Sequence, residues 1–399
     1  MLAPRWRVVV SLFVVTSCIA TAVSTFGVFL PVLSDTFGWS RGAVSVVLSI
    51  SLMLGGVAAF PVGRIADRHG PRVVLAITVA IGAVGFVLSA TIDALWHLYL
   101  SYGVLVGIGM SSIYVLTAAT VARWFEARRG LALAIVLSGF NLGWLTGGPL
   151  AAFLIGHWGW RTAYLVLGAL VAAVGVPVSL TVRYPRAMQS RAVIAAAPAA
   201  ARRAAFGDTR LWFFVTAWCF LGLVFMMVTV HSVSYARDRG LPLEQASLAL
   251  SAFGIGAVSG RLLAGAAADR FGAVRTMRVC LLIQCGALAV LLMGLPTWTV
   301  VGTLLLFGLG ASGADNTFVK AVSDVFGLAA LATIMSVVGL GWRSGAAIGP
   351  ALAGFVYDVR GSYTPSFAFA VVALVVGWML FRLGSAPARA RSAPSASGS

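Results

Sequence analysis

Two arginines lie deep inside long apolar stretches of the sequence, where a charged side chain is costly. Arg261 precedes Asp269 by about eight residues, or about 12 Å along a helix. Arg343 lies roughly ten residues into another apolar stretch. An arginine at the centre of a bilayer costs at least about 2.5 to 3.5 kcal/mol unless a partner compensates its charge. Asp315 can neutralise only one of the two arginines. Each guanidinium offers a pair of parallel donors, which matches the two oxygens of a carboxylate ligand.

Two arrangements without a substrate could also account for these arginines. Their side chains could extend to the membrane surface, although both lie near the midplane. Alternatively, Asp315 could form a permanent ion pair with one arginine. The excess of one positive charge favours an anionic substrate.

Four further polar residues could take part in this chemistry. Tyr114 and Asn316 could donate hydrogen bonds to a bound carboxylate. Asp315 and His231 are the candidates for carrying a proton. The sequence has no order of residues typical of a catalytic triad, no metal-ligand cluster and no phosphate-binding glycine loop. We therefore expect neither a cofactor, nor a metal, nor an enzyme.

The composition places these residues on membrane-spanning helices. Of 399 residues, 60% are hydrophobic and 10% are charged, which excludes a water-soluble globule. At about 20 residues per span, the sequence predicts an all-α membrane protein with about twelve transmembrane helices. Their centres are expected near residues 20, 54, 83, 109, 142, 172, 223, 257, 286, 309, 344 and 373.

A short polar motif occurs twice, at matching places in the two halves of the chain. Residues 63–72 read GRIADRHGPR and residues 265–275 read GAAADRFGAVR, with their aspartates about 202 residues apart. Each copy lies between two apolar stretches, so we expect two parallel six-helix repeats. The predicted units are an N-terminal bundle (1–182), a cytoplasmic linker (183–209), a C-terminal bundle (210–384) and a disordered cytoplasmic tail (385–399).

The net charge of +17 is distributed unevenly along this topology. If the N-terminus is cytoplasmic, about 20 arginines fall in cytoplasmic segments and 5 in the opposite loops. This distribution follows the positive-inside rule and places both termini in the cytoplasm. We therefore assign the charge to membrane topology and expect no nucleic-acid partner.

The duplicated loop resembles the signature of the major facilitator superfamily. A second segment, residues 123–132 (RWFEARRGLA), is similar to a signature of its monocarboxylate transporter and oxalate/formate antiporter branch. Residues 26–41 also resemble the corresponding segment of bacterial members of that branch. The resemblance implies a secondary transporter that works by alternating access. It also implies that the loop residues latch one conformation through ion pairs: Gly63, Asp67, Arg68, Gly70, Arg72, Asp269 and Arg270.

The same resemblance assigns roles to both buried arginines. Arg261 stands where the branch carries its substrate-binding arginine, and Arg343 where oxalate-type members carry a second basic residue. The chain departs from animal-type members at Ser24, where they have a lysine, and at Ala257, where they have an aspartate. A proton-coupling pair at those two positions is therefore absent.

Together these observations predict a transporter of small organic anions, with lactate- or pyruvate-like monocarboxylates as the first hypothesis. Proton symport and anion exchange both stay open. The alternatives are an oxalate-type dicarboxylate exchanger and a proton antiporter of lipophilic drugs. We expect a monomer in the bacterial inner membrane, with the lipid bilayer, the anion substrate and, for symport, protons as its partners.

Overall fold

The computed structural model describes residues 4–125, 128–185, 206–296, 298–327 and 331–386. Residues 186–205 of the predicted linker and residues 387–399 of the predicted tail lie outside this part of the chain. The described residues form helices and no β-strand, as predicted.

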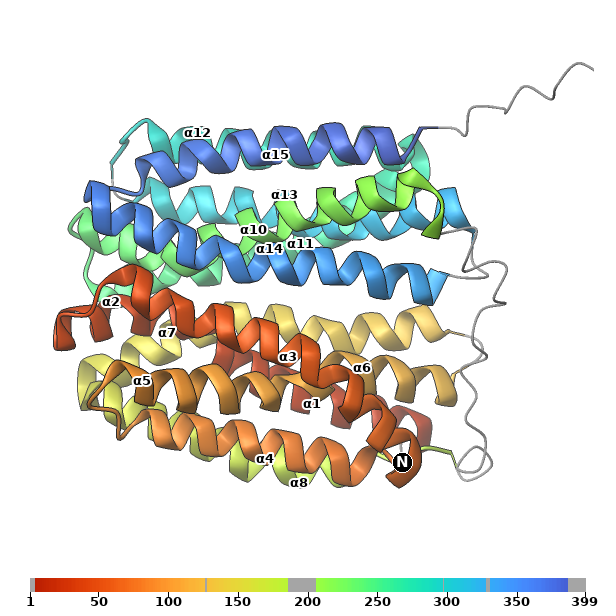
Figure 1. The fold of residues 1–399 in the computed structure, drawn as a ribbon, viewed down its shortest axis with the longest axis horizontal. Coiled ribbons are helices and arrows are strands. Elements are labelled where there is room, and N and C mark those ends of the chain that lie inside the picture. The colour runs from red at the N-terminus through yellow and green to blue at the C-terminus, as the bar shows by residue number, and fades with distance from the viewer. Residues whose placement is uncertain (1–3, 126–127, 186–205, 297, 328–330, 387–399) are drawn as a thin grey trace, which may run out of the picture.

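The helices of the first half lie side by side in the lower part of Figure 1. They are α1 (Pro4–Ser24), α2 (Phe26–Phe37), α3 (Arg41–His69), α4 (Pro71–Ser89), α5 (Leu95–Leu98), η1 (Tyr99–Val106), α6 (Gly107–Trp124), α7 (Arg129–Leu170), η2 (Val171–Gly175) and α8 (Val176–Ser179).

The helices of the second half lie in the upper part of Figure 1. They are α10 (Thr209–Asp238), α11 (Leu243–Phe271), α12 (Ala273–Leu292), α13 (Thr299–Phe326), α14 (Leu331–Arg360) and α15 (Thr364–Gly384). We call the end of the molecule that holds Pro4 and Gly384 the terminal end, and the opposite end the distal end.

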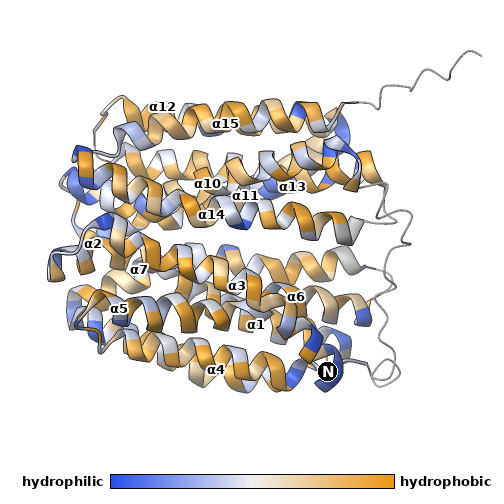
Figure 2. Ribbon diagram, in the orientation of Figure 1, coloured by the Kyte–Doolittle hydropathy of each residue, from blue (hydrophilic) through white to orange (hydrophobic). Residues whose placement is uncertain are grey.

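The predicted twelve spans agree with these helices. Nine helical segments of the described chain are long and apolar enough to cross a membrane. One of them, Leu131–Ser179, turns at Gly159 and therefore supplies two spans, and α13 and α14 complete the twelve. Figure 2 shows apolar residues along the length of the helices and hydrophilic ones mainly near their ends. The structure confirms an all-α fold of two six-helix bundles.

The duplicated loop forms the same turn twice. Gly70 joins α3 to α4 with φ 84° and ψ 160°, and Gly272 joins α11 to α12 with φ 84° and ψ 155°. A positive φ is strained for residues with a Cβ, so each copy of the motif needs its glycine here. Two distant segments therefore have one backbone conformation as well as one sequence pattern.

Glycines allow matching helix pairs to approach closely in the two halves. A Cβ on Gly143 of α7 would collide with the backbone of Ala20 in α1, and a Cβ on Gly345 of α14 would collide with the backbone of Cys219 in α10. In lipid the hydrophobic effect does not drive helices together. Helix association depends instead on close packing, which small residues at the contacts allow. The first and fifth spans of each half are thus packed in the same way.

We predict that Gly345→Val destabilises the protein by about 1 to 3 kcal/mol, because the added carbons would force α14 away from α10. Thermal unfolding of the purified protein in detergent measures the effect. Gly302→Val on α13 is the matched control, since a Cβ there meets nothing within 4 Å. Equal unfolding temperatures for the two variants would contradict the prediction.

Candidate functional site

Arg261 and Asp315 face each other between α11 and α13, but the contact is loose. Nη2 of Arg261 lies 3.9 Å from Oδ2 of Asp315, with about a third of each side chain exposed. This distance exceeds that of a hydrogen bond. In addition, Nε of Arg261 is buried and has no hydrogen-bond partner among the described residues. The guanidinium therefore keeps donors free for another acceptor.

Close packing of α11 on α13 brings these side chains together. A Cβ on Gly260 would collide with the backbone of Leu309, so the helices touch one residue before Arg261. Nδ2 of Asn316 donates a hydrogen bond of 2.9 Å to the backbone oxygen of Arg261. Asn316 thus fixes the backbone that carries Arg261, while its predicted contact with a substrate stays a prediction.

Arg343 extends from α14 toward the first half of the chain. Its side chain lies beside Gly56 of α3. Among the described residues, no ion pair or hydrogen bond is formed by its guanidinium. The second predicted arginine is therefore available for an anion, and it reaches the boundary between the two halves.

Tyr114 lies near both arginines and belongs to the opposite half of the chain. It lies on α6, is 48% exposed, and stacks on Phe140 of α7 with ring centroids 4.7 Å apart. Its hydroxyl lies within electrostatic range of Arg261, Arg343 and Asp315. The structure therefore brings four of the predicted site residues into one region between the bundles.

An aromatic cluster, which sequence reasoning missed, lies in the same middle part of the helices. Trp144 of α7 contacts Phe225 of α10 and Phe253 of α11, with centroid distances of 6.1 and 5.5 Å. Trp342 of α14 contacts Phe225 at 6.0 Å. These rings form an apolar contact between the halves and offer an apolar surface near the arginines.

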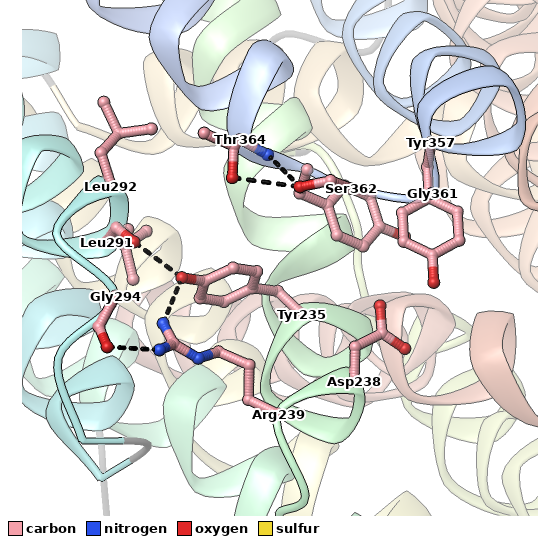
Figure 3. Close-up of a pocket in the computed structure, with 11 residues that line it drawn as sticks. Tyr235, Asp238, Arg239, Leu291, Leu292, Gly294, Tyr357, Gly361, Ser362 and Thr364 are labelled. Atoms are coloured by element: carbon pink, nitrogen blue, oxygen red, sulfur yellow. Dashed lines mark hydrogen bonds between the residues drawn. The ribbon is translucent and has the colours of Figure 1, made fainter.

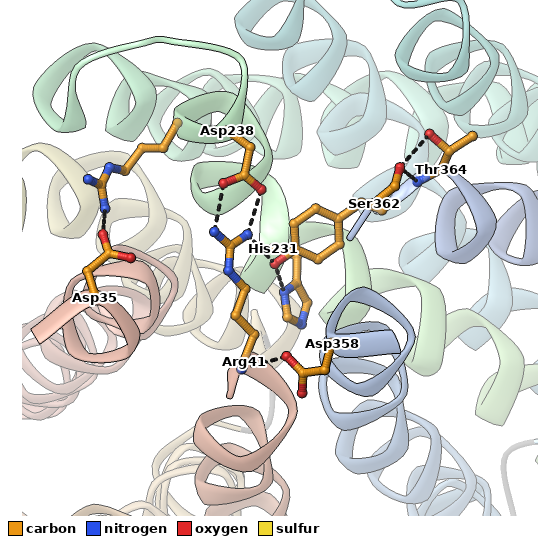
Figure 4. A network of polar contacts seen from close by, with 9 residues as sticks. Asp35, Arg41, His231, Asp238, Asp358, Ser362 and Thr364 are labelled. Atoms are coloured by element: carbon orange, nitrogen blue, oxygen red, sulfur yellow. Dashed lines mark hydrogen bonds and ion pairs between the residues drawn. The ribbon is translucent and has the colours of Figure 1, made fainter. Parts of the chain in front are cut away.

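His231 lies elsewhere, in a polar network at the distal end (Figure 4). Its Nε2 lies 2.8 Å from the backbone oxygen of Pro350, so this nitrogen carries the proton. Its Nδ1 then accepts from the hydroxyl of Tyr363 at 3.0 Å. Burial raises the pKa of Tyr363, with Arg41 opposing, which keeps this hydroxyl a donor at neutral pH. Both ring nitrogens of His231 thus have hydrogen-bond partners, at the distal end of α10 and away from Arg261 and Arg343.

The same network joins the two halves through Arg41 at the start of α3. Its guanidinium donates two hydrogen bonds of 2.6 Å to Asp238 at the end of α10, and a third of 3.0 Å to Tyr363. Backbone N–H groups of Arg41 and Gly42 both donate to the carboxylate of Asp358, at 2.9 and 2.8 Å. An aspartate of one half thus caps a helix of the other half.

We call the contacts of Arg41 with Asp238, Asp358 and Tyr363 the distal lock. A further ion pair, Arg237 with Asp35 at 2.9 Å, lies beside it between α10 and α2. The inter-half hydrogen bonds and ion pairs described here lie at the distal end or near the centre. Sequence reasoning missed the lock, although Arg41 was one of only 5 arginines in the predicted loops opposite the cytoplasmic side.

A cavity of about 270 Å³ lies next to the distal lock in the second half (Figure 3). Tyr235, Asp238, Arg239 and Tyr363 contribute to its wall. Arg239 donates to the hydroxyl of Tyr235 and to the backbone oxygen of Gly294, both at 2.6 Å. Both terminal nitrogens of its guanidinium already donate to neutral acceptors of the protein, so we assign the anion chemistry to Arg261 and Arg343 instead.

The predicted latch residues lie at the terminal end and pair inside their own halves. Asp67 accepts a hydrogen bond of 2.8 Å from Arg123 of α6, whose guanidinium lies 3.9 Å from the ring centre of Tyr184. In the second half, Asp269 pairs with Lys320 of α13 at 3.3 Å. Each aspartate ties its turn to another helix of the same bundle. The side chains of Arg68, Arg72 and Arg270 are exposed.

Two parallel six-helix repeats with polar groups near the membrane midplane between them define a secondary transporter by class. The sequence profile of the Major Facilitator Superfamily matches residues 12–248 and 232–398. This chain belongs to that superfamily of transporters.

Relatives confirm the resemblance to the monocarboxylate transporter branch. Monocarboxylate transporter 11 of Mus musculus is 30% identical over 384 residues, covering 91% of this chain and 83% of the relative. Monocarboxylate transporter 12 of Xenopus laevis is 25% identical over 421 residues, covering 98% and 91%.

Solved structures share the fold at low sequence identity. A bacterial homolog of the human lysosomal transporter Spinster, in an inward-facing and unoccupied conformation, matches with a TM-score of 0.80 at 16% identity, covering 96% of this chain and 98% of that one. The nucleoside transporter NupG matches with a TM-score of 0.79 at 14% identity, covering 96% and 100%.

We predict that Arg41→Ala weakens the distal lock, because the bidentate bond to Asp238 and the bond to Tyr363 are lost. For a partly exposed pair this is worth about 1 to 2 kcal/mol, or roughly a 5- to 30-fold change in a two-state ratio. A cysteine at Ser45, which is buried behind the lock, reports opening through its labelling rate with a membrane-impermeant maleimide in a background lacking native cysteines.

The control for this experiment is Arg360→Ala, which removes an exposed arginine at the distal end of α14. It should leave the labelling rate of the Ser45 cysteine unchanged. Equal labelling in the Arg41→Ala and control proteins would show that the network does not hold the halves together.

Proposed function

We propose that this protein transports small organic anions across a bacterial inner membrane, with lactate- or pyruvate-like monocarboxylates as the main class. One observation carries the proposal: two arginines lie between the bundles, and the only described carboxylate beside them is 3.9 Å from Arg261 and pairs with neither closely.

A carboxylate substrate fits the charge and the geometry of this region. Two guanidinium groups and one carboxylate leave one uncompensated positive charge, which a monoanion would neutralise. Guanidinium donates in parallel pairs to the two oxygens of a carboxylate, and these charge-assisted bonds are stronger than neutral ones. The free Nε of Arg261 and the exposed hydroxyl of Tyr114 supply further donors.

A dicarboxylate is the second candidate, and the state of Arg343 favours it. This guanidinium has no ion pair or hydrogen bond among the described residues, so it could hold a second carboxylate while Arg261 holds the first. Two guanidinium groups would balance both charges of an oxalate-like dianion if Asp315 took up a proton at the same time.

The orientation follows from the arginine distribution, which supports cytoplasmic termini. In that orientation the distal lock closes the outer side, and the site would exchange substrate with the cytoplasm. Opening outward would require the lock to break and the terminal ends of the bundles to approach each other. We propose that a monomer suffices for this cycle, since both halves of the site belong to one chain.

Coupling to protons would involve Asp315 or His231. An anion that binds Arg261 competes with Asp315, and a carboxylate that loses its counter-charge takes up a proton more readily. The neutralised site could then change between states. Protonation of His231 would instead remove the acceptor for Tyr363 and thereby act on the distal lock. The competing proposal is anion exchange, in which only the anion-filled protein reorients.

We predict that Arg261→Ala lowers the affinity for a monocarboxylate such as lactate by about 10-fold or more, since a bond between charged groups contributes about 1.5 to 3 kcal/mol. Arg261→Lys should also be impaired, because an ammonium cannot reproduce the planar fork. Isothermal titration of the purified proteins measures both, with Arg360→Ala as the control. Wild-type affinity in Arg261→Ala would refute the proposed site.

Proton coupling is tested by uptake into proteoliposomes under an inward pH gradient. For symport through these residues, Asp315→Asn or His231→Gln should abolish the stimulation by the gradient, since neither amide titrates. Counterflow with internal substrate, measured in parallel, should persist in the variant that loses only proton coupling. Gradient-driven uptake that is unchanged in both variants would exclude both residues, and counterflow without any pH response would favour exchange.

A further inference from the structure

Helices α3 and α14 run side by side across the boundary between the halves, from the distal lock to the centre of the molecule. At the distal end, Gly42 of α3 lies against Phe355 and Asp358 of α14. Further in, the hydroxyl of Ser49 donates to the backbone oxygen of Ala347. The contact ends near the centre with Gly56 and Arg343, which are 15 residues from Arg41 and Asp358 along their helices.

The side chain of Arg343 passes directly over Gly56. A Cβ built at this glycine would lie 3.2 Å from Cδ of Arg343, 3.8 Å from Nη1 and 3.9 Å from Nε. The contact with Cδ is closer than most contacts of a Cβ, and the contacts with the two nitrogens are ordinary van der Waals contacts. Side-chain atoms beyond the Cβ of a larger residue at position 56 would therefore meet the stem and guanidinium of Arg343, and a glycine leaves this space to them.

The neighbouring glycine has a different task. A Cβ on Gly55 would lie 2.9 Å from the backbone oxygen of Gly107 in α6, so Gly55 allows two helices of the same half to pack. Consecutive residues of a helix point about 100° apart. Gly55 therefore serves packing inside the first half, whereas Gly56 faces the second half and contacts a candidate ligand of the substrate.

We propose that Gly56 is a positioning residue for substrate specificity: by leaving room for Arg343, it lets the site bind acids that carry a second oxygen acceptor beside their carboxylate. This inference rests on the proposed anion site. Arg261 holds the carboxylate, and Arg343 holds the second group, which is a 2-hydroxyl, a 2-oxo group or a second carboxylate. The position of Tyr114 near both arginines supports a shared site.

The proposal distinguishes three anions by their second acceptor; oxalate also carries a second negative charge. Propionate has a carboxylate alone, lactate adds a hydroxyl, and oxalate adds a second carboxylate. A side chain at position 56 would displace the guanidinium of Arg343 and leave Arg261 in place. Affinity for oxalate and lactate should then fall more than affinity for propionate, since propionate has no second acceptor for a hydrogen bond from Arg343.

The test is a double-mutant cycle in the full-length protein, with equilibrium binding of the three anions measured by isothermal titration. Gly56→Val should lower oxalate affinity by about 10-fold or more, as expected for a lost charged hydrogen bond, and leave propionate affinity within about twofold. Arg343→Ala should lower oxalate affinity at least as much, and propionate affinity less, because only the attraction of its charge is lost for propionate. The double variant should bind oxalate no more weakly than Arg343→Ala alone, because both changes remove the same contact.

Gly302→Val, which places the same side chain where nothing lies within 4 Å, controls for the presence of valine in a helix. Gly56→Ala adds only the Cβ and should produce a smaller shift in the same direction, so the test holds even if Gly56→Val does not fold. Equal losses for all three anions, unchanged oxalate affinity, or additive losses in the double variant would each overturn the role of Gly56. A wild-type protein that binds none of the anions would overturn the proposed function as well.

Discussion

A positive charge near the middle of a membrane must be compensated, and this constraint organises the centre of the protein. Among the described residues, Arg261 has one acidic neighbour, Asp315, 3.9 Å from its guanidinium, and Arg343 has no ion pair. A tight permanent ion pair would have left few guanidinium donors for a substrate. The loose pair leaves donors that a substrate anion could use, and the free-energy cost of this incompletely paired charge must be offset by the packing of the surrounding helices.

The distal lock joins the two bundles through charged and polar groups at the ends of helices. Asp358 illustrates this, because it accepts from the first N–H groups of α3, which any helix leaves without an internal partner. In the centre, the contact between halves is made instead by aromatic rings and by the stem of Arg343.

The structure shows the surroundings of Ser24 and Ala257, the two positions where the sequence departs from animal-type monocarboxylate transporters. Ser24, at the position of their lysine, donates a hydrogen bond of 2.7 Å to the backbone oxygen of Gly143, and both lie where α1 and α7 pack closely. Ala257, at the position of their aspartate, is almost fully buried in α11. Neither position offers a charge here, so a proton-coupled cycle in this chain would have to use other groups.

The sequence alone determined the all-α membrane fold, the twelve spans and the duplicated turns, because span length, composition and repeated glycine motifs are local properties. It also singled out Arg261, Arg343 and Asp315, since ionisable residues in apolar stretches are rare. Four contacts could not be predicted from the sequence, because they depend on how each helix is rotated about its axis. They are the hydrogen bonds of His231, the hydrogen bond from Asn316 to a backbone oxygen, the capping of α3 by Asp358, and the contact of Arg343 with Gly56. In a lipid environment helices are apolar on most faces, so the sequence carries little amphipathic pattern to fix that rotation, and only the packing of helices far apart in the chain decides it.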